Sequence, residues 1–139
     1  MAGVTAFGTT LKIGGTAGTA VVNVTSVEGP GLSSEYIDTT AHDSSGSYRE
    51  FVPSFLDAGE VTLRINYDPA AATHKNAAGG LLYLFTNKTS SSFAIGFPTT
   101  PVSYVVFTGY VSAFAPSAPY DGKLEADVTI RITGAPTLP

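Results

Sequence analysis

The stretch that decides the fold is residues 104–133, YVVFTGYVSAFAPSAPYDGKLEADVTIRIT. Its second half, Leu124 to Thr133, alternates apolar and polar side chains without a break. Such period-two alternation is the signature of a strand with one face on a core. The first half, Tyr104 to Phe114, shows the same period, and the turn formers of 115–123 separate the two. We therefore predict a long hairpin, whose first strand turns one row of residues to the core: Val105, Phe107, Gly109, Val111 and Ala113.

The rest of the chain supplies more strands and no evident internal repeat. Alternation and β-branched residues predict about six or seven strands in all. Mostly consecutive strands favour a mainly β fold, an antiparallel β-sandwich or partly closed barrel flanked by one α-helix. We expect a single domain over residues 1–139. The other expected strands are Thr10–Ile13, Ala20–Val27, Ser34–Thr39, Gly59–Tyr67 and Ser92–Phe97.

One helix is expected, from Pro69 to about Phe85. Asp68 is a good N-cap, and Pro69 suits the first helical position because its missing N–H would have no partner there. The pair Gly79-Gly80 weakens this helix by about 1 kcal/mol per glycine relative to alanine. A break or an early end at this pair is therefore the alternative to a continuous helix.

The composition excludes several classes of protein. Apolar residues make up 43% of the 139 residues and charged residues 13%, which is not a disordered composition. There is no cysteine, so disulfides and thiolate metal sites are excluded. The net charge of −4 argues against nucleic-acid binding by a basic patch. No stretch reaches the length of a membrane-spanning helix, so no membrane insertion is expected.

An unusual segment follows the third expected strand, at about residues 40–58. It is rich in serine, has no clean periodicity and still carries several large apolar side chains. Loops of this length are uncommon in compact domains and are usually functional or disordered. The residues leave two alternatives at equal weight: an Ω-like loop packed on its own domain, or an arm that docks on another subunit.

The search for catalytic and metal sites finds little. His74 has no histidine or carboxylate four residues later, which argues against a metal site in the expected helix. His42 and Asp43 lie among serines, but no nucleophile-elbow signature accompanies them. Asp121-Gly122 is a turn signal, without the pattern of a calcium loop. We therefore expect no enzyme activity, no cofactor and no metal.

A polar row on the last strand remains to be explained. It consists of Glu125, Asp127, Thr129 and Arg131. A mixed polar sheet face is usually just solvated. It can also line a water-filled channel when several chains close their sheets into a common barrel.

The order of these features resembles the major tail tube proteins of long flexible-tailed bacteriophages. No single piece is specific, but the order and spacing together are. The matching pieces span nearly the whole chain. They are residues 8–12 (GTTLK), 41–44 (AHDS), 48–52 (YREFV), 56–61 (LDAGEV), 66–69 (NYDP), 95–98 (IGFP), 107–112 (FTGYVS) and 128–134 (VTIRITG).

The resemblance implies a structural virion protein of the phage tail, assembled in the cytoplasm of the bacterial host. In this family hexameric rings stack into a tube, and its lumen conducts DNA from capsid to host cell. Implied partners are other copies of the chain, a tape-measure protein, a tail terminator and baseplate or distal tail proteins. The long loop reaches the neighbouring ring in this family. The residues it assigns to that contact here are His42, Asp43, Tyr48, Arg49, Glu50, Phe51 and Phe55.

The same resemblance makes a lumen the candidate environment of the polar row, with Arg131 offset by Glu125 and Asp127. Attraction to phosphates would brake passing DNA, so a lumen should avoid basic patches.

Two other readings remain. One is a tail-completion or decoration protein of related fold, which caps a tube instead of polymerising. The other is a carbohydrate-binding β-sandwich, which needs an exposed aromatic platform. Its candidates are Tyr104, Tyr110 and Tyr120.

Overall fold

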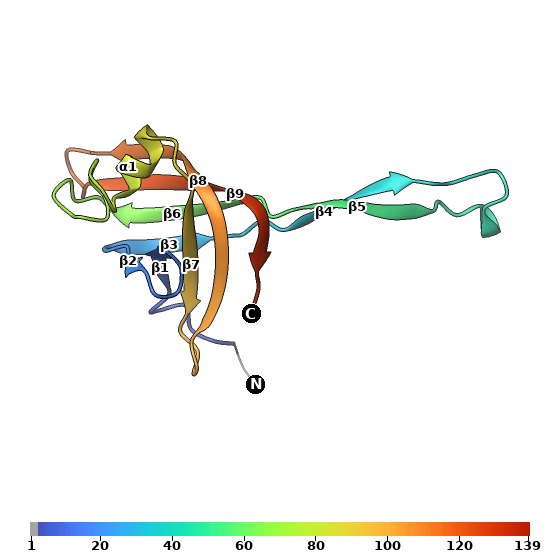
Figure 1. Cartoon of the computed structure of the whole chain (residues 1–139), viewed down its shortest axis with the longest axis horizontal. Helices are drawn as coiled ribbons and strands as arrows, with labels where there is room; N and C mark the ends of the chain where they lie inside the picture. Colours follow the sequence, from blue (N-terminus) through green and yellow to red (C-terminus); the bar gives the residue numbers. More distant parts are fainter. Residues whose placement is uncertain (1–2) are drawn as a thin grey trace.

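The computed structural model describes residues 3–139, and its main feature is one antiparallel sheet that curls on itself (Figure 1). The order of its seven strands is β2-β1-β7-β8-β9-β6-β3. The curl brings β3, at one edge, back toward β1 near the other edge. The predicted fold class, in its partly closed barrel form, is confirmed. The strands are β1 Thr10–Ile13, β2 Thr19–Ala20, β3 Val24–Glu28, β6 Glu60–Asn66, β7 Ser91–Phe97, β8 Ser103–Ser117 and β9 Glu125–Thr137.

The hairpin of β8 and β9 organises this sheet, as the sequence predicts. β8 pairs with β7 through residues 103–109 and with β9 through residues 106–117, so it is the strand about which the sheet bends. The expected linker at 115–123 is shorter than predicted, because β8 continues to Ser117. The turn itself is closed by a hydrogen bond from the Gly122 N–H to the Pro119 carbonyl.

A bulge in β8 overturns part of the predicted core row. Val111 is opposite Ile130, but the next pair is Ala113 with Thr129, so Ser112 is an extra residue in β8. One extra residue reverses which side chains face the core. Ala113 is therefore exposed, and Phe114 packs against the core in its place.

The core lies inside the curl and is closed at one side by a short helix. Phe93 of β7 and Phe107 of β8 stack there with ring centroids 5.6 Å apart. The apolar row of β9 is buried as predicted from Ala126 to Ile132. Helix α1, Leu81–Thr86, covers this core with Leu81 and Leu84.

The predicted helix from Pro69 to Phe85 is wrong over residues 69–80, which form successive turns. Gly79 has φ +90°, which a right-handed helix does not allow, so the glycine pair precedes α1. Hydrogen bonds of the His74 side chain stabilise these turns. The ring of His74 is fully buried, and its Nε2 lies 2.8 Å from the Val22 carbonyl oxygen. The Asp68 N–H donates to its Nδ1 at 3.2 Å. This pairing makes Nε2–H the donor to Val22.

The strand predicted at Ala20–Val27 is interrupted. Residues 22–23 form a turn in which Asn23 has φ +60°, a conformation that asparagine tolerates better than most residues. The segment therefore divides into β2 and β3, which pair with different strands.

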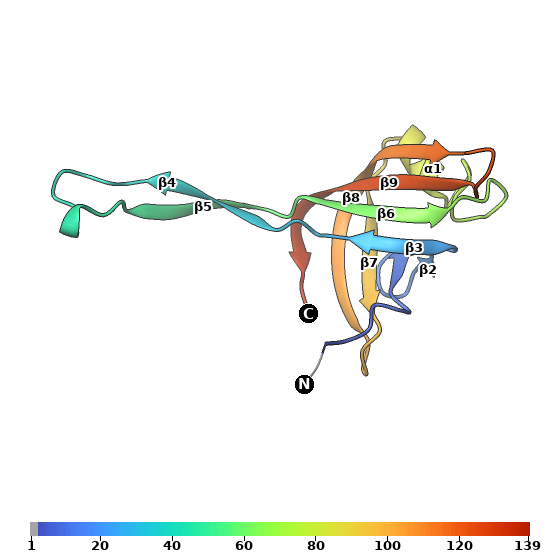
Figure 2. The same cartoon turned by 180° about the vertical axis from the view of Figure 1, so that it is seen from behind.

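A second, two-stranded sheet projects from the body of the molecule (Figures 1 and 2). It pairs β4, Ser33–Asp38, with β5, Phe51–Asp57, and a short 3-10 helix η1, Ser45–Ser47, lies at its tip. We call residues 33–57 the arm and the other described residues the body. Within the long segment at 40–58, residues 51–57 thus form a strand that the sequence pattern did not predict. It also does not pack on its own domain, so the Ω-like alternative is wrong.

Candidate functional site

The polar row of β9 belongs to a broad polar face formed by four strands. Residues directly opposite each other in a sheet point to the same side. Glu60, Thr62, Arg64 and Asn66 of β6 are opposite Arg131, Thr129, Asp127 and Glu125, in that order. Tyr110, Ala113, Ala115 and Ser117 of β8 flank the same row from the other side, and β3 adds Ser26 and Glu28. We call this surface the polar face; it is the side of the sheet turned away from the core.

Each arginine of the polar face is paired with a carboxylate. Arg64 Nε donates to Asp127 Oδ1 at 2.9 Å, and Nη2 lies 3.5 Å from Oδ2. This hydrogen bond, the charge of Asp127 and then the charges of Glu125 and Glu28 raise the pKa of Arg64 above its ordinary value. The shift records an environment dominated by negative charge.

The charge of Arg131 is compensated by residues other than those predicted from the sequence. Its Nη2 lies 3.4 Å from Asp57 Oδ2 and its Nη1 3.7 Å from Glu60 Oε1. The expected partners Glu125 and Asp127 lie further along the strand, where Asp127 pairs with Arg64 instead. Alternation along β9 identifies the residues of one strand only, whereas the compensation comes from β6 and from the base of the arm.

The arm is ordered by bonds within its own tip. Arg49 Nη1 lies 3.3 Å from Asp38 Oδ2, and the Ser44 hydroxyl donates to Glu50 Oε2 at 2.8 Å. The pKa of Asp38 is kept below its ordinary value of 3.8, and the largest cause is the Thr40 side chain. The second cause is the backbone N–H of Thr40, which lies 2.9 Å from Asp38 Oδ1. The residues that the resemblance assigns to inter-ring contact are all exposed on this ribbon: His42, Asp43, Tyr48, Arg49, Glu50, Phe51 and Phe55.

The structure brings no catalytic or metal-binding group together in the arm. Ser44, beside His42 and Asp43, bonds to Glu50, so a Ser–His–Asp triad is not formed there. Within residues 3–139 no group of three histidine, cysteine or acidic side chains is close enough to hold a metal. Nor does that part of the chain contain a helix long and apolar enough to cross a membrane.

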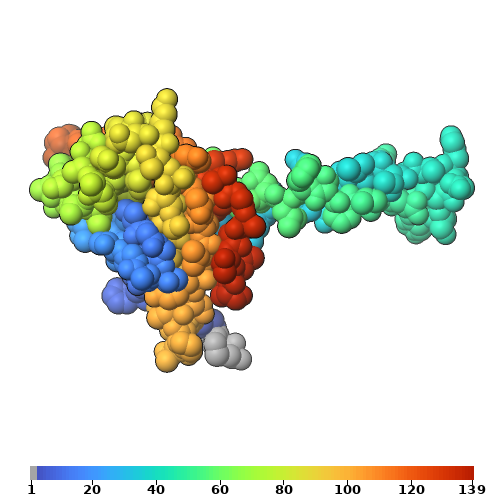
Figure 3. All heavy atoms as spheres, in the orientation of Figure 1, coloured from blue at the N-terminus to red at the C-terminus, as the bar shows by residue number. Residues whose placement is uncertain are grey.

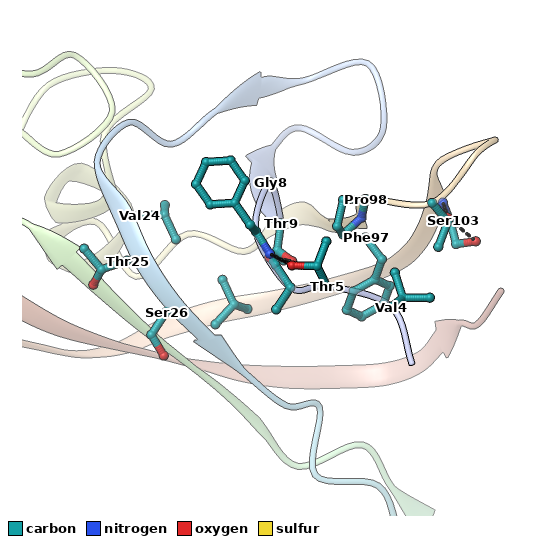
Figure 4. A pocket seen from close by; sticks show the side chains of 14 residues that line it. Val4, Thr5, Gly8, Thr9, Val24, Thr25, Ser26, Phe97, Pro98 and Ser103 are labelled. Carbon is teal, nitrogen blue, oxygen red and sulfur yellow. Dashed lines mark hydrogen bonds between the residues drawn. The ribbon is translucent and has the colours of Figure 1, made fainter. Parts of the chain in front are cut away.

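A groove of about 840 Å³ lies between the N-terminal segment and β3 (Figure 4). Apolar and hydroxyl side chains line it, among them Val4, Thr9, Thr25 and Phe97. None of its lining residues is acidic or basic. General acid–base chemistry by side chains has therefore no group to use in this groove.

The three tyrosines proposed as a carbohydrate platform are not assembled into one. Tyr104 bonds through its hydroxyl to Lys12 Nζ at 3.4 Å, near the start of β8. Tyr110 lies six residues further along the strand, about 20 Å away. Tyr120 is fully exposed in the β8–β9 turn. A sugar ring cannot stack on this set.

Comparisons with known proteins agree with this architecture. A family model described as "Lambda phage tail tube protein, TTP" matches residues 13–139. No curated protein sequence matches the chain.

Solved structures of low sequence identity share the fold. A chain from the virion of a native gene transfer agent particle has a TM-score of 0.77 and 13% identity, with 99% of each chain covered. A chain from the extended sheath/tube terminator of an extracellular contractile injection system has a TM-score of 0.74 and 12% identity, with coverage of 100% and 98%. A chain from the tail of an empty gene transfer agent particle, solved with C6 symmetry, has a TM-score of 0.66 and 13% identity, with 88% of each chain covered.

The family model covers most of the chain, including the hairpin, the polar face and the arm. The chain therefore belongs to the lambda phage tail tube protein family and is a structural tail tube subunit.

Proposed function

We propose that copies of this chain form hexameric rings that stack into a tail tube, with the polar face turned to a lumen that conducts DNA. The observation that carries the proposal is the polar face itself. Both of its arginines are held by carboxylates, and further carboxylates surround them. A surface of this kind offers phosphates no free cation, so DNA slides past it without being bound. The row Glu125, Asp127, Thr129 and Arg131 is the part we assign to the lumen.

Ring closure in this proposal uses the open edges of the sheet. β2 and β3 are its edge strands, and neither has a second neighbouring strand within residues 3–139. Pairing edges between copies removes such open edges, and closed symmetry satisfies them all. The C6 symmetry of the gene transfer agent tail supports a six-membered ring.

Stacking uses the arm, which reaches a neighbouring ring. The chain then has a mechanical and not a catalytic role, and its partners are the tape-measure protein inside the tube, the tail terminator and the baseplate or distal tail proteins at its ends. Head-to-tail contacts stay open and so build a filament of rings.

A second candidate, a tail-completion protein, is favoured by the fold shared with a tube terminator. Negative-stain electron microscopy of the purified protein across a concentration series separates the two. Hollow tubes with a regular axial repeat support the tube subunit. Single rings that never stack contradict it and support the completion protein.

A further inference from the structure

The curled sheet leaves an open seam between β3 and the segment that leads into β1. β3 pairs with β6 and has no second neighbouring strand within residues 3–139. Residues 24–27 of β3 and residues 4–9 lie on opposite sides of the groove of about 840 Å³ (Figure 4). We call residues 4–9 the strap. The arm leaves the seam uncovered, because none of its residues lines the groove and it projects away from the body (Figure 3).

The hydrogen bonds of the strap are internal. The Phe7 N–H donates to Thr5 Oγ1 at 3.3 Å. The Thr9 N–H and the Thr9 hydroxyl both donate to the Ala6 carbonyl oxygen, at 3.1 Å and 2.7 Å. Within residues 3–139 no hydrogen bond joins the strap to β3. The strap can therefore move relative to β3 without breaking a bond between them.

Both sides of the groove carry apolar area that closure would bury. Val4 and Phe7 of the strap are 53% and 90% exposed. Opposite them, Val24 and Val27 of β3 pack against the core and are only partly buried. No acidic or basic residue lines the groove. Bringing the strap onto β3 thus removes apolar surface from water and desolvates no ionised group.

The topology of the sheet favours antiparallel pairing between the strap and β3. Five antiparallel pairings separate β1 from β3, so these two strands run in opposite directions. The strap enters β1 through a turn in which Gly8 has φ +97°, a conformation that glycine adopts without strain. A strap that follows the direction of β1 along the seam is antiparallel to β3. It can then satisfy the backbone groups of this edge in the more stable of the two strand pairings.

We propose that the strap closes on β3 in the free subunit and covers the edge that ring closure uses. This inference rests on the proposed function for what the edge does in the assembly. The closed strap is an autoinhibitory contact, because a neighbouring copy can pair with β3 only while the strap is open. The apparent affinity between copies is reduced by the fraction of subunits that are open. Covering the edge also protects the free subunit from uncontrolled edge-to-edge pairing.

A reversible lock tests the competition between the strap and a neighbouring copy. The chain has no cysteine, so Ala6→Cys with Thr25→Cys introduces one possible disulfide within a subunit. The bridge holds the two Cα atoms about 4.4–6.8 Å apart and so keeps the strap on β3. We expect the bridge to form in dilute free subunit under mild oxidation. The oxidised subunit should form no rings or tubes in electron micrographs, and reduction should restore them.

The matched control for the lock is Ala6→Ser with Thr25→Ser, which should assemble equally well before and after the same treatments. A bridge that does not form in the free subunit contradicts closure of the strap. Oxidised, bridged subunits that assemble like the reduced ones contradict its competition with a neighbouring copy.

Weakening the strap should have the opposite effect. Val4→Ser with Phe7→Ser removes the apolar side chains that favour closure. We expect severalfold faster hydrogen exchange at the amides of residues 24–28 in the free subunit, and severalfold earlier tube formation by light scattering. Val22→Ser, at an exposed valine outside the strap, should change neither quantity. Unchanged exchange or slower assembly of the double variant would overturn the inference.

The two levels of the proposal fail in different ways. Absence of rings and tubes from the wild-type chain contradicts the proposed function. Hydrogen exchange at β3 and formation of the bridge are measured in the free subunit, so they report on the strap whether or not tubes form.

Discussion

Gly59 and Gly31 touch where the two strands of the arm leave the body. A Cβ atom at Gly59 would lie 2.5 Å from the carbonyl oxygen of Gly31, and Gly59 has φ +72°. The crossing is therefore closed to any side chain, and it sets the direction in which the arm projects.

Replacing Gly59 by alanine should misdirect the arm. Gly134→Ala is a matched control, because Gly134 has φ +78° but open space around its Cβ position. Alanine at Gly134 should cost about 1 kcal/mol through backbone strain alone. Alanine at Gly59 adds the steric clash, so we expect a larger loss in urea unfolding and no tubes. Equal losses for the two variants would show that the crossing is not tight.

His74 should stabilise the turns that precede α1. His74→Phe keeps an aromatic ring but leaves the Val22 carbonyl and the Asp68 N–H without their partner. Each buried group left unpaired costs about 1–3 kcal/mol, so we expect a clear decrease in the free energy of unfolding. Lys75→Ala, at an exposed neighbour, should change it little. Urea denaturation measures both variants, and equal stability of His74→Phe and wild type would contradict this role.

Removing the carboxylates around Arg131 should make the proposed lumen attract DNA. Asp57→Asn with Glu60→Gln leaves the guanidinium without either of its ion-pair partners. Assembled tubes of this variant should bind short duplex DNA at low salt, with binding that falls steeply as salt rises. Glu35→Gln with Asp121→Asn removes the same charge elsewhere and should not have this effect. DNA binding by both variants alike would argue against Arg131 facing the lumen.

Charge reversal in the arm should block stacking and leave the subunit folded. Arg49→Glu places a carboxylate beside Asp38. Phe51→Asp replaces an exposed phenyl ring of the arm with a carboxylate. We expect no tubes in electron micrographs from either variant, with unchanged circular dichroism of the subunit, because the arm contributes nothing to the core. Arg49→Lys keeps the charge and should assemble. Tubes like those of wild type from either charged variant would remove the assignment of the arm to stacking.

Acid should loosen the tip of the arm at a defined carboxyl group. The pKa of Asp38 lies below 3.8, so the stabilisation it gives is present above that value and is lost as pH falls through the lowered pKa. Thr40→Val removes the side-chain hydrogen bond, the largest cause of the shift, and should move the pKa of Asp38 back upward. An NMR titration of the carboxyl carbon measures it. An unmoved pKa in Thr40→Val would contradict the role of the hydroxyl.

The fold was predictable from the sequence where alternation is local and uninterrupted. The apolar row of β9 fixed its buried face because every second side chain is apolar. The bulge at Ser112 was hidden, since one extra residue in β8 is visible only against the register of its partner strand. The helix prediction failed because the capping pattern of Asp68 and Pro69 fits a turn as well, and tertiary bonds to His74 decided between them.

The polar face was predictable from the sequence only in part. The alternation of β9 identified its row of side chains, but Arg131 is paired with residues far away in the sequence, which no single-strand pattern reveals. The arm was recognised as a segment with apolar side chains. Its strand β5 was missed because Pro53 and an extra residue at Ser54–Phe55, a bulge opposite β4, obscure the period of two.

The concentration of negative charge in the arm also bears on the life of the subunit before assembly. An exposed apolar ribbon is a template for uncontrolled aggregation. Four of the five carboxylates of the arm are next to a large apolar side chain in the sequence, in the manner of gatekeeper residues; they are Glu35, Asp38, Glu50 and Asp57. Two free subunits therefore repel each other most strongly at the place where they would otherwise stick. The same twenty-five residues, 33–57, therefore contribute both to the solubility of the unassembled chain and to its capacity to polymerise.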